Sequence, residues 1–186
     1  TRAEATQRQG RAGRVAEGVC YRLWTQGEEG ALQSFPPAEI EAADLTGLAL
    51  ELALWGATED DLAFLTPPPE GALAEARSLL LGALDETSRI TAHGKTLAAL
   101  PLHPRLTHML AVAGPQAAPL AALIAERDPL RGAPCDLALR LRALRDPRGF
   151  GRAHPYEVNT AALTRITTEA KRLGRAIRQN RANGLS

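Results

Sequence analysis

The 186-residue sequence has few of the residue types that build disulfide, metal and redox sites. It contains two cysteines, one methionine and four histidines, and aromatic residues make up 4% of the chain. Cys20 and Cys135 lie far apart and have no second cysteine or histidine at ligand spacing, so neither a disulfide framework nor a zinc site is supported. We interpret both cysteines as small buried residues. The histidines lack an accompanying acid and nucleophile, so we expect structural or surface positions for all four and no metal site.

Long apolar runs are also missing from the sequence. No stretch approaches the ~20 residues that a membrane-spanning helix needs, and the start of the chain has no basic segment followed by an apolar one. We therefore expect a soluble, cytoplasmic protein with no membrane partner. Since 45% of the residues are apolar, the chain can bury a core in one large domain or two small ones.

The net charge of +1 conceals two oppositely charged parts. Residues 31–90 hold two Lys or Arg and eleven Asp or Glu, a net charge of −9. Residues 91–186 hold fifteen Lys or Arg and six acids, a net charge of +9. Such a basic segment is the electrostatic footprint of a polyanion-binding protein, although a solvated basic surface explains the same count.

The most informative motif is a run of arginines and glycines near the start, Gln7-Arg8-Gln9-Gly10-Arg11-Ala12-Gly13-Arg14. Its arginines recur every third residue, which suits a loop or a first helical turn where guanidinium and backbone groups converge on a polyanion. The best candidate for that anion is the terminal phosphate of a nucleotide. Surface ion pairs with acids such as Glu4 and Glu17 are the alternative interpretation of the run.

Residues 18–24 follow the arginine run and alternate in character. Val19, Tyr21 and Leu23 take every second position, a pattern that predicts a half-buried strand. A single strand cannot form a sheet, so its partners would lie before Thr1. We therefore interpret residues 1–35 as the last edge of a larger α/β domain.

Two proline groups divide the next segment, residues 36–102, into helices. After Pro36-Pro37, apolar residues recur at helical spacing from Leu45 to Trp55, and Gly56 then ends the predicted helix. A second helix is predicted over residues 73–80, after three prolines, and a short strand over residues 89–91. Two helices and a small β wing are the outline of a winged-helix domain.

Residues 103–186 are predicted to be helical wherever they are regular. Stripes of apolar residues predict helices around residues 106–110 and 137–144, and the stretch 145–156, rich in Gly, Pro and Arg, is predicted to be a loop. A long final helix is predicted from the apolar positions between Leu163 and Ile177. Its opposite face carries five cations, which are candidate phosphate contacts for single-stranded RNA: Arg165, Lys171, Arg172, Arg175 and Arg178.

The arginine run closely resembles motif VI, Gln-Arg-x-Gly-Arg-x-Gly-Arg, of the superfamily 2 helicases. A series of further phrases resembles, in the right order, DEAH-box RNA helicases and in particular their bacterial HrpB-type branch. These phrases lie at residues 18–24, 44–56, 67–69, 82–85, 100–106 and 126–132. Together the matches cover most of residues 1–132, whereas the basic tail resembles the family only in character.

This resemblance implies a mainly α chain with the terminal edge of a RecA-like α/β domain over residues 1–35, a winged-helix domain over 36–102 and a helical ratchet-type bundle over 103–186. It also implies that Arg11 and Arg14 are arginine fingers at the γ-phosphate of ATP, that Gln7 orients the attacking water, and that Arg8 secures an interdomain contact. The implied partners are single-stranded RNA, ATP with Mg²⁺, and N-terminal RecA-like domains of the same protein that precede Thr1.

Two motifs of nucleotide hydrolysis are absent from the sequence. It has no Gly-x-x-x-x-Gly-Lys-Ser/Thr loop and no Asp-Glu-x-His box, which supply the phosphate cradle and the magnesium-binding acids. These 186 residues alone are therefore expected not to hydrolyse ATP. The leading hypothesis is the C-terminal portion of an ATP-dependent RNA helicase, and the alternative is a non-catalytic winged-helix module that binds nucleic acid.

Overall fold

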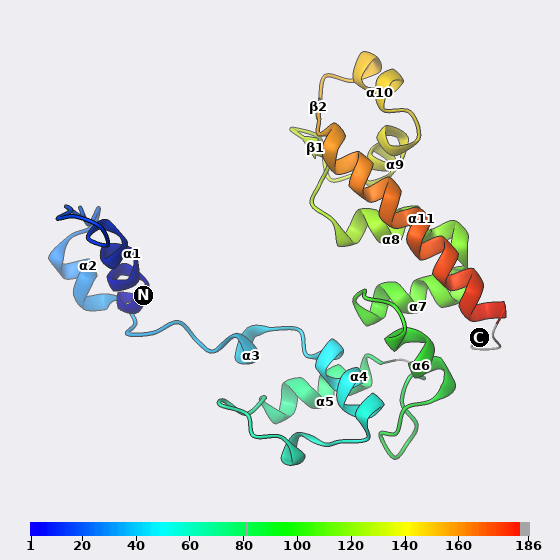
Figure 1. Ribbon diagram of the computed structural model, residues 1–186, viewed down its shortest axis with the longest axis horizontal. Coiled ribbons are helices and arrows are strands. Elements are labelled where there is room, and N and C mark those ends of the chain that lie inside the picture. The colour runs from blue at the N-terminus through cyan, green and yellow to red at the C-terminus, as the bar shows by residue number, and fades with distance from the viewer. Residues whose placement is uncertain (81, 183–186) are drawn as a thin grey trace. The chain divides into compact units, whose positions relative to one another are not determined.

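The computed structural model describes the backbone of residues 1–80 and 82–182, and the side chains of these residues except 181 and 182. The chain divides into two compact units, Thr1–Ala43 with Leu65–Pro69 and Asp44–Phe64 with Glu70–Ser186 (Figure 1). Within the described ranges, two strands of two residues each are the only named strands, and helices make up the rest of the regular structure. The predicted mainly α fold is confirmed.

The first unit contains three short helices, α1 (Arg2–Ala12), α2 (Gln26–Ala31) and α3 (Glu39–Ala42). Thr1 and Thr25 begin α1 and α2 with capping boxes, in which the threonine hydroxyl accepts a hydrogen bond from the backbone N–H three residues later. Backbone N–H groups at the start of α1 donate to the carbonyls of Gln33 and Ser34, at 2.9 and 3.0 Å. No residue of the segment 1–43 is buried, so this segment has no core of its own.

The predicted strand over residues 18–24 is wrong, because the structure gives this segment no regular secondary structure. A strand exists only when a second strand completes its hydrogen-bond ladder, and the described part of the chain offers none beside it. Gly18 lies where an added Cβ would overlap the Ala12 carbonyl oxygen, so the segment returns closely against the end of α1.

The second unit begins with α4 (Thr46–Trp55), η1 (Glu59–Asp61), α5 (Glu70–Ser78) and α6 (Ala92–Ala98). The predicted helices after both proline groups are thus confirmed, and Gly56 ends α4 with a φ of 70°. The predicted short strand at residues 89–91 is reduced to an isolated antiparallel bridge between Leu84 and Ile90.

The rest of the second unit comprises α7 (Pro104–Ala113), η2 (Pro115–Ala117), α8 (Ala118–Ala125), β1 (Leu130–Arg131), α9 (Leu137–Arg145), α10 (Pro147–Ala153), β2 (Glu157–Val158) and α11 (Thr160–Ala182). Helix α11, drawn orange to red in Figure 1, packs along α8 and against α9. Ile166, Leu173 and Ile177 of its apolar stripe are buried in the main core, and Leu163 is buried in a second cluster with Phe150. Strands β1 and β2 pair antiparallel, with Leu130 opposite Val158.

Two further predictions are wrong. The stretch 145–156 is not only a loop, because α10 forms within it: Asp146 caps the helix through Gly149 N–H, Pro147 occupies its first turn, and Phe150 is buried. The cysteines are not buried either, since Cys20 and Cys135 are both exposed. Each lies in a segment that the core does not cover.

The predicted domain boundaries after residues 35 and 102 stay predictions. The division seen in the structure falls between Ala43 and Asp44, and α6 packs directly on α7 across the second predicted boundary. Within the described residues, no helix is both long and apolar enough to cross a membrane.

Candidate nucleotide and nucleic-acid interfaces

The arginine run lies in the second half of α1 and just beyond it, rather than in a loop or a first helical turn. Gln7 and Arg11 are one helical turn apart, and Arg14 follows after Gly13, which ends the helix. All three side chains are exposed. Among the described residues, neither Arg11 nor Arg14 makes an ion pair, so both guanidinium groups are available to an anion.

The surface ion pairs considered for this run involve other residues. Glu4 accepts hydrogen bonds from the chain's terminal ammonium, at 2.9 Å, and from the Thr1 hydroxyl. These bonds lower the pKa of Glu4, and the charge of Arg8 one turn away adds a smaller effect. Arg22 bonds to Gln9 at 3.0 Å and to Glu29. None of these bonds involves Arg11 or Arg14.

Helix α11 carries all five predicted phosphate contacts on its exposed face. At about 100° per residue, Arg165, Lys171, Arg172, Arg175 and Arg178 span roughly 140° of the helix circumference, opposite the buried stripe. Each of the five side chains is exposed. The sequence periodicity therefore placed the basic face correctly, and RNA binding by this face stays a prediction.

These five cations differ in their neighbours. Arg172 holds Glu169 with two hydrogen bonds, at 2.6 and 2.8 Å, which lowers the pKa of Glu169 and raises that of Arg172. Arg165 lies 3.9 Å from the carboxylate of Glu126. For Lys171, Arg175 and Arg178, no ion pair is found among the described residues. These three are the cations most free to bind phosphate.

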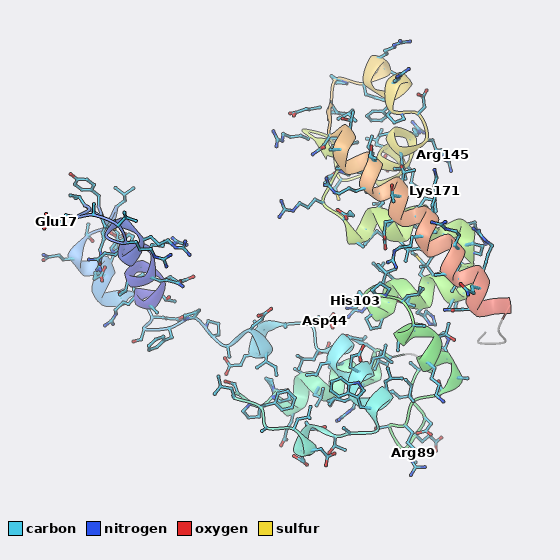
Figure 2. All side chains as sticks on the ribbon, viewed as in Figure 1. Glu17, Asp44, Arg89, His103, Arg145 and Lys171 are labelled. Atoms are coloured by element: carbon cyan, nitrogen blue, oxygen red, sulfur yellow. The ribbon has the colours of Figure 1, made fainter. Side chains whose placement is uncertain are left out.

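A cavity of about 590 Å³ lies beside this basic face, between η2, α8, α9 and α11. We call it the α8/α11 cavity. Leu141, Leu144 and other apolar side chains line it, and its cations are Arg145, Lys171 and Arg178. Figure 2 shows Arg145 and Lys171 near one another beside α11. Sequence reasoning missed Arg145, because α9 and α11 are brought together only by packing.

The phrase at residues 126–132 has a structural role. Arg140 of α9 is 6% exposed, and its guanidinium bonds to both carboxylate oxygens of Asp128, at 2.6 and 3.2 Å. The same guanidinium donates to the carbonyls of Pro134 and Asp136. Arg140 therefore fixes the loop that contains β1 onto α9, and it lowers the pKa of Asp128.

Three histidines make side-chain contacts in the second unit, and the fourth, His154, packs against Phe150. His93 Nε2 lies 2.9 Å from His108 Nδ1 between α6 and α7, and burial lowers the pKa of His93. His103 begins α7 and lies 3.2 Å from Asp44, a contact visible in Figure 2. In the part of the chain that the structure describes, no group of three or more His, Cys, Asp or Glu could hold a metal ion.

Comparisons with known proteins find RNA helicases among the relatives of this chain. In an alignment of 115 positions that covers 59% of this chain, the identity to the ATP-dependent RNA helicase HrpB of Escherichia coli K12 is 44%, and the chain covers 14% of that protein. It is 38% identical over 130 residues to human DHX37, named a probable ATP-dependent RNA helicase, and covers 11% of it. No protein-family model matches. The chain is thus homologous to the DEAH-box ATP-dependent RNA helicases.

Within this class, HrpB appears in both kinds of comparison. The crystal structure of the Escherichia coli DEAH/RHA helicase HrpB matches with a TM-score of 0.72 and 30% sequence identity, over 96% of this chain and 21% of that chain. A second HrpB structure, described as a DExH-box NTPase, gives a TM-score of 0.65 and 32% identity over 93% of this chain. The resemblance to the HrpB-type branch is confirmed, for a chain that spans only a small share of its relatives.

Proposed function

We propose that this chain is the portion of an ATP-dependent RNA helicase that supplies the arginine fingers and part of the RNA-handling surface. The observation that carries the proposal is the homology to helicases combined with the two unpaired arginines, Arg11 and Arg14, at the end of α1. The relatives' names favour this function over a non-catalytic nucleic-acid-binding module.

The exposed guanidinium groups suit the terminal phosphate of ATP. Phosphoryl transfer spreads negative charge over the phosphate oxygens, and a guanidinium fork meets that charge with two parallel hydrogen bonds. Bound Mg²⁺ would neutralise the same phosphates. Arg11 and Arg14 would stabilise the transferring group, and Gln7, one turn before Arg11, would orient the attacking water. Most ligands of ATP and Mg²⁺ would come from RecA-like domains outside these residues.

The exposed apolar surface of the first unit is consistent with contact to a RecA-like domain. Its exposed apolar side chains include Val15, Val19, Tyr21, Leu23 and Phe35, each at least 74% exposed. A group of large apolar residues that no core covers marks an interaction surface. In our proposal, the RecA-like part of the same protein covers this surface and completes the ATP site.

Steady-state ATPase measurements on the complete protein test the arginine assignment. Arg11→Lys keeps the charge but loses the fork, so kcat should fall by about 10³-fold or more, as for other arginine fingers. Arg131→Lys is the matched control, because Arg131 is an exposed arginine on β1, outside α1 and the arginine run. Equal effects of the two substitutions would contradict the assignment.

The basic face of α11 is proposed to contact RNA phosphates. Lys171, Arg175 and Arg178 can do so without giving up an acid partner, whereas Arg165 and Arg172 would have to exchange one. Each phosphate contact on a single strand should contribute about 0.7 to the slope of log affinity against log salt. Arg175→Gln should therefore lower the slope by roughly that amount. Wild-type affinity that barely responds to salt would contradict RNA binding by this face.

A further inference from the structure

The α8/α11 cavity is open to solvent and lined mainly by half-buried apolar side chains. Pro115, Leu120, Leu141 and Leu144 form much of its surface, and α11 faces it with the small residues Ala170 and Gly174. Small residues on α11 leave the space that larger ones would fill. The cavity has a volume typical of ligand sites, which run from about 300 to 1,000 Å³.

The polar groups of the cavity are cationic. Arg145, Lys171 and Arg178 are exposed and line it, and no lining residue is acidic. An occupant that covers the apolar surface must therefore carry negative charge beside its apolar part. Without that charge, the occupant would desolvate three cations and leave them uncompensated.

A nucleic acid meets only half of this requirement. Bases need a stacking surface or partners for their polar edges, and the lining includes no aromatic residue. Its two uncharged polar side chains are already engaged: Thr167 donates to the Leu163 carbonyl at 2.8 Å, and Gln116 donates to the Ala113 carbonyl. Phosphates would suit the cations, but bases would gain little from the rest of the cavity.

We propose that the α8/α11 cavity is a docking site for an acidic amphipathic helix of a partner protein. Apolar side chains one turn apart on that helix would enter between α8, α9 and α11, as in other helix-in-groove complexes. Asp or Glu residues flanking them would meet Arg145, Lys171 and Arg178. Since Lys171 and Arg178 also belong to the proposed RNA face, a bound partner helix would compete with RNA for these two cations.

Gly174 offers a direct way to close the cavity. A Cβ placed on it would lie 3.7 Å from Ala118 Cβ and 3.8 Å from the Pro115 carbonyl oxygen, which are ordinary contacts. The same Cβ would lie 3.7 Å from Arg178 Nη1, so Gly174→Leu would add a larger side chain at the cavity wall beside this cation. Gly174→Ala also replaces a glycine by a residue that favours the helix, but its methyl group leaves most of the cavity open. It is therefore the matched control.

Fluorescence anisotropy on the complete protein provides the test. The probe is a labelled synthetic helix with leucines at positions i, i+3 and i+7 and glutamates beside them, and a scrambled peptide of equal charge is its control. Gly174→Leu should weaken binding of the helix by about 10-fold or more, while Gly174→Ala stays within about 2-fold. Arg145→Glu should weaken it several-fold, while Arg142→Glu on the same helix, outside the lining, should not.

Three results would overturn the proposal. The scrambled peptide could bind as well as the helix, which would reduce the interaction to charge alone. Gly174→Leu could leave the peptide affinity unchanged. Gly174→Leu could lower the affinity for a labelled oligouridine and leave the affinity for the peptide unchanged, which would assign the cavity to RNA. Loss of helix binding in Gly174→Leu with oligouridine binding retained would support the docking site, because RNA would then need the basic face of α11 but not the apolar part of the cavity.

Discussion

Replacing Asp128 by Asn tests whether the Arg140 contact holds the β1 loop onto α9. The amide keeps the shape of the side chain. Its oxygen can still accept the hydrogen bond that the Leu130 N–H donates to Asp128 Oδ1 at 2.9 Å. It removes the charge that faces Arg140, whose side chain is 8% exposed. Two unit charges about 4 Å apart interact by about 4 kcal/mol at an effective dielectric constant of 20. The Asp128 side chain is 50% exposed, so solvent screening reduces the loss to about 2 kcal/mol.

Thermal unfolding followed by circular dichroism measures this loss. For a domain of this size, about 2 kcal/mol corresponds to a decrease in Tm of roughly 4–8 °C. Glu157→Gln is the matched control, because Glu157 lies 3.6 Å from Arg131 in the same part of the chain, with both side chains mostly exposed. An exposed pair of this kind should change the unfolding free energy by less than about 0.5 kcal/mol.

The pH dependence separates the charge effect from a packing effect. The hydrogen bonds from Arg140 lower the pKa of Asp128 in the folded protein. The stabilisation is therefore fully present above the unfolded carboxyl pKa of about 3.9, and it is lost as the pH falls through the lower folded value. The Tm difference between wild type and Asp128→Asn should shrink in this acid range. A difference that stays constant there, or is absent at neutral pH, refutes the reasoning.

Three further substitutions have expected outcomes in the same unfolding assay. Gly174→Ala removes a glycine from the interior of α11 and should stabilise the protein by about 0.5–1 kcal/mol, whereas destabilisation would mean that α8 cannot accept the methyl group. Phe150→Ala should cost about 3–5 kcal/mol if α10 is anchored by this buried ring. Asp44→Ala should cost about 1 kcal/mol by removing the acceptor of the Thr46 N–H at the start of α4. Hydrogen bonds from Thr46 lower the pKa of Asp44 to about 2. The stability difference between wild type and Asp44→Ala should therefore persist in mild acid and disappear only between about pH 4 and pH 2. A loss of the difference at higher pH would contradict this reasoning.

Local signals in the sequence predicted several helices of the second unit: α4, α5, α7, α9 and α11. Gly56 ends α4 in the left-handed conformation that glycine favours, and the apolar stripe between Leu163 and Ile177 is the buried face of α11. These features depend on residues within one or two turns of each other. The basic face of α11 followed from the same periodicity, because charged residues occupy the positions that the core leaves free.

Features that depend on distant residues could not be predicted in this way. The alternation at residues 18–24 is compatible with a strand, yet a strand needs a neighbour that local pattern cannot supply. Arg145 and Lys171 line one cavity only because α9 packs beside α11. Helix α10 is a different case, since its signals were present: Asp146 and Pro147 are a helix start, and Phe150 is its anchor. The glycines and arginines of that stretch obscured them.

The missing core of the first unit bears on how the proposed ATP site is controlled. Helix α1 is tied to the rest of its unit by hydrogen bonds to Gln33 and Ser34 and by the guanidinium of Arg2, all at exposed positions. A misplacement of about 1 Å can cost an enzyme about 10²-fold in rate. Under the proposed role of Arg11, the surface that covers Val15 and Tyr21 would set the position of the guanidinium. That surface would then act as a regulator of the reaction without touching the nucleotide.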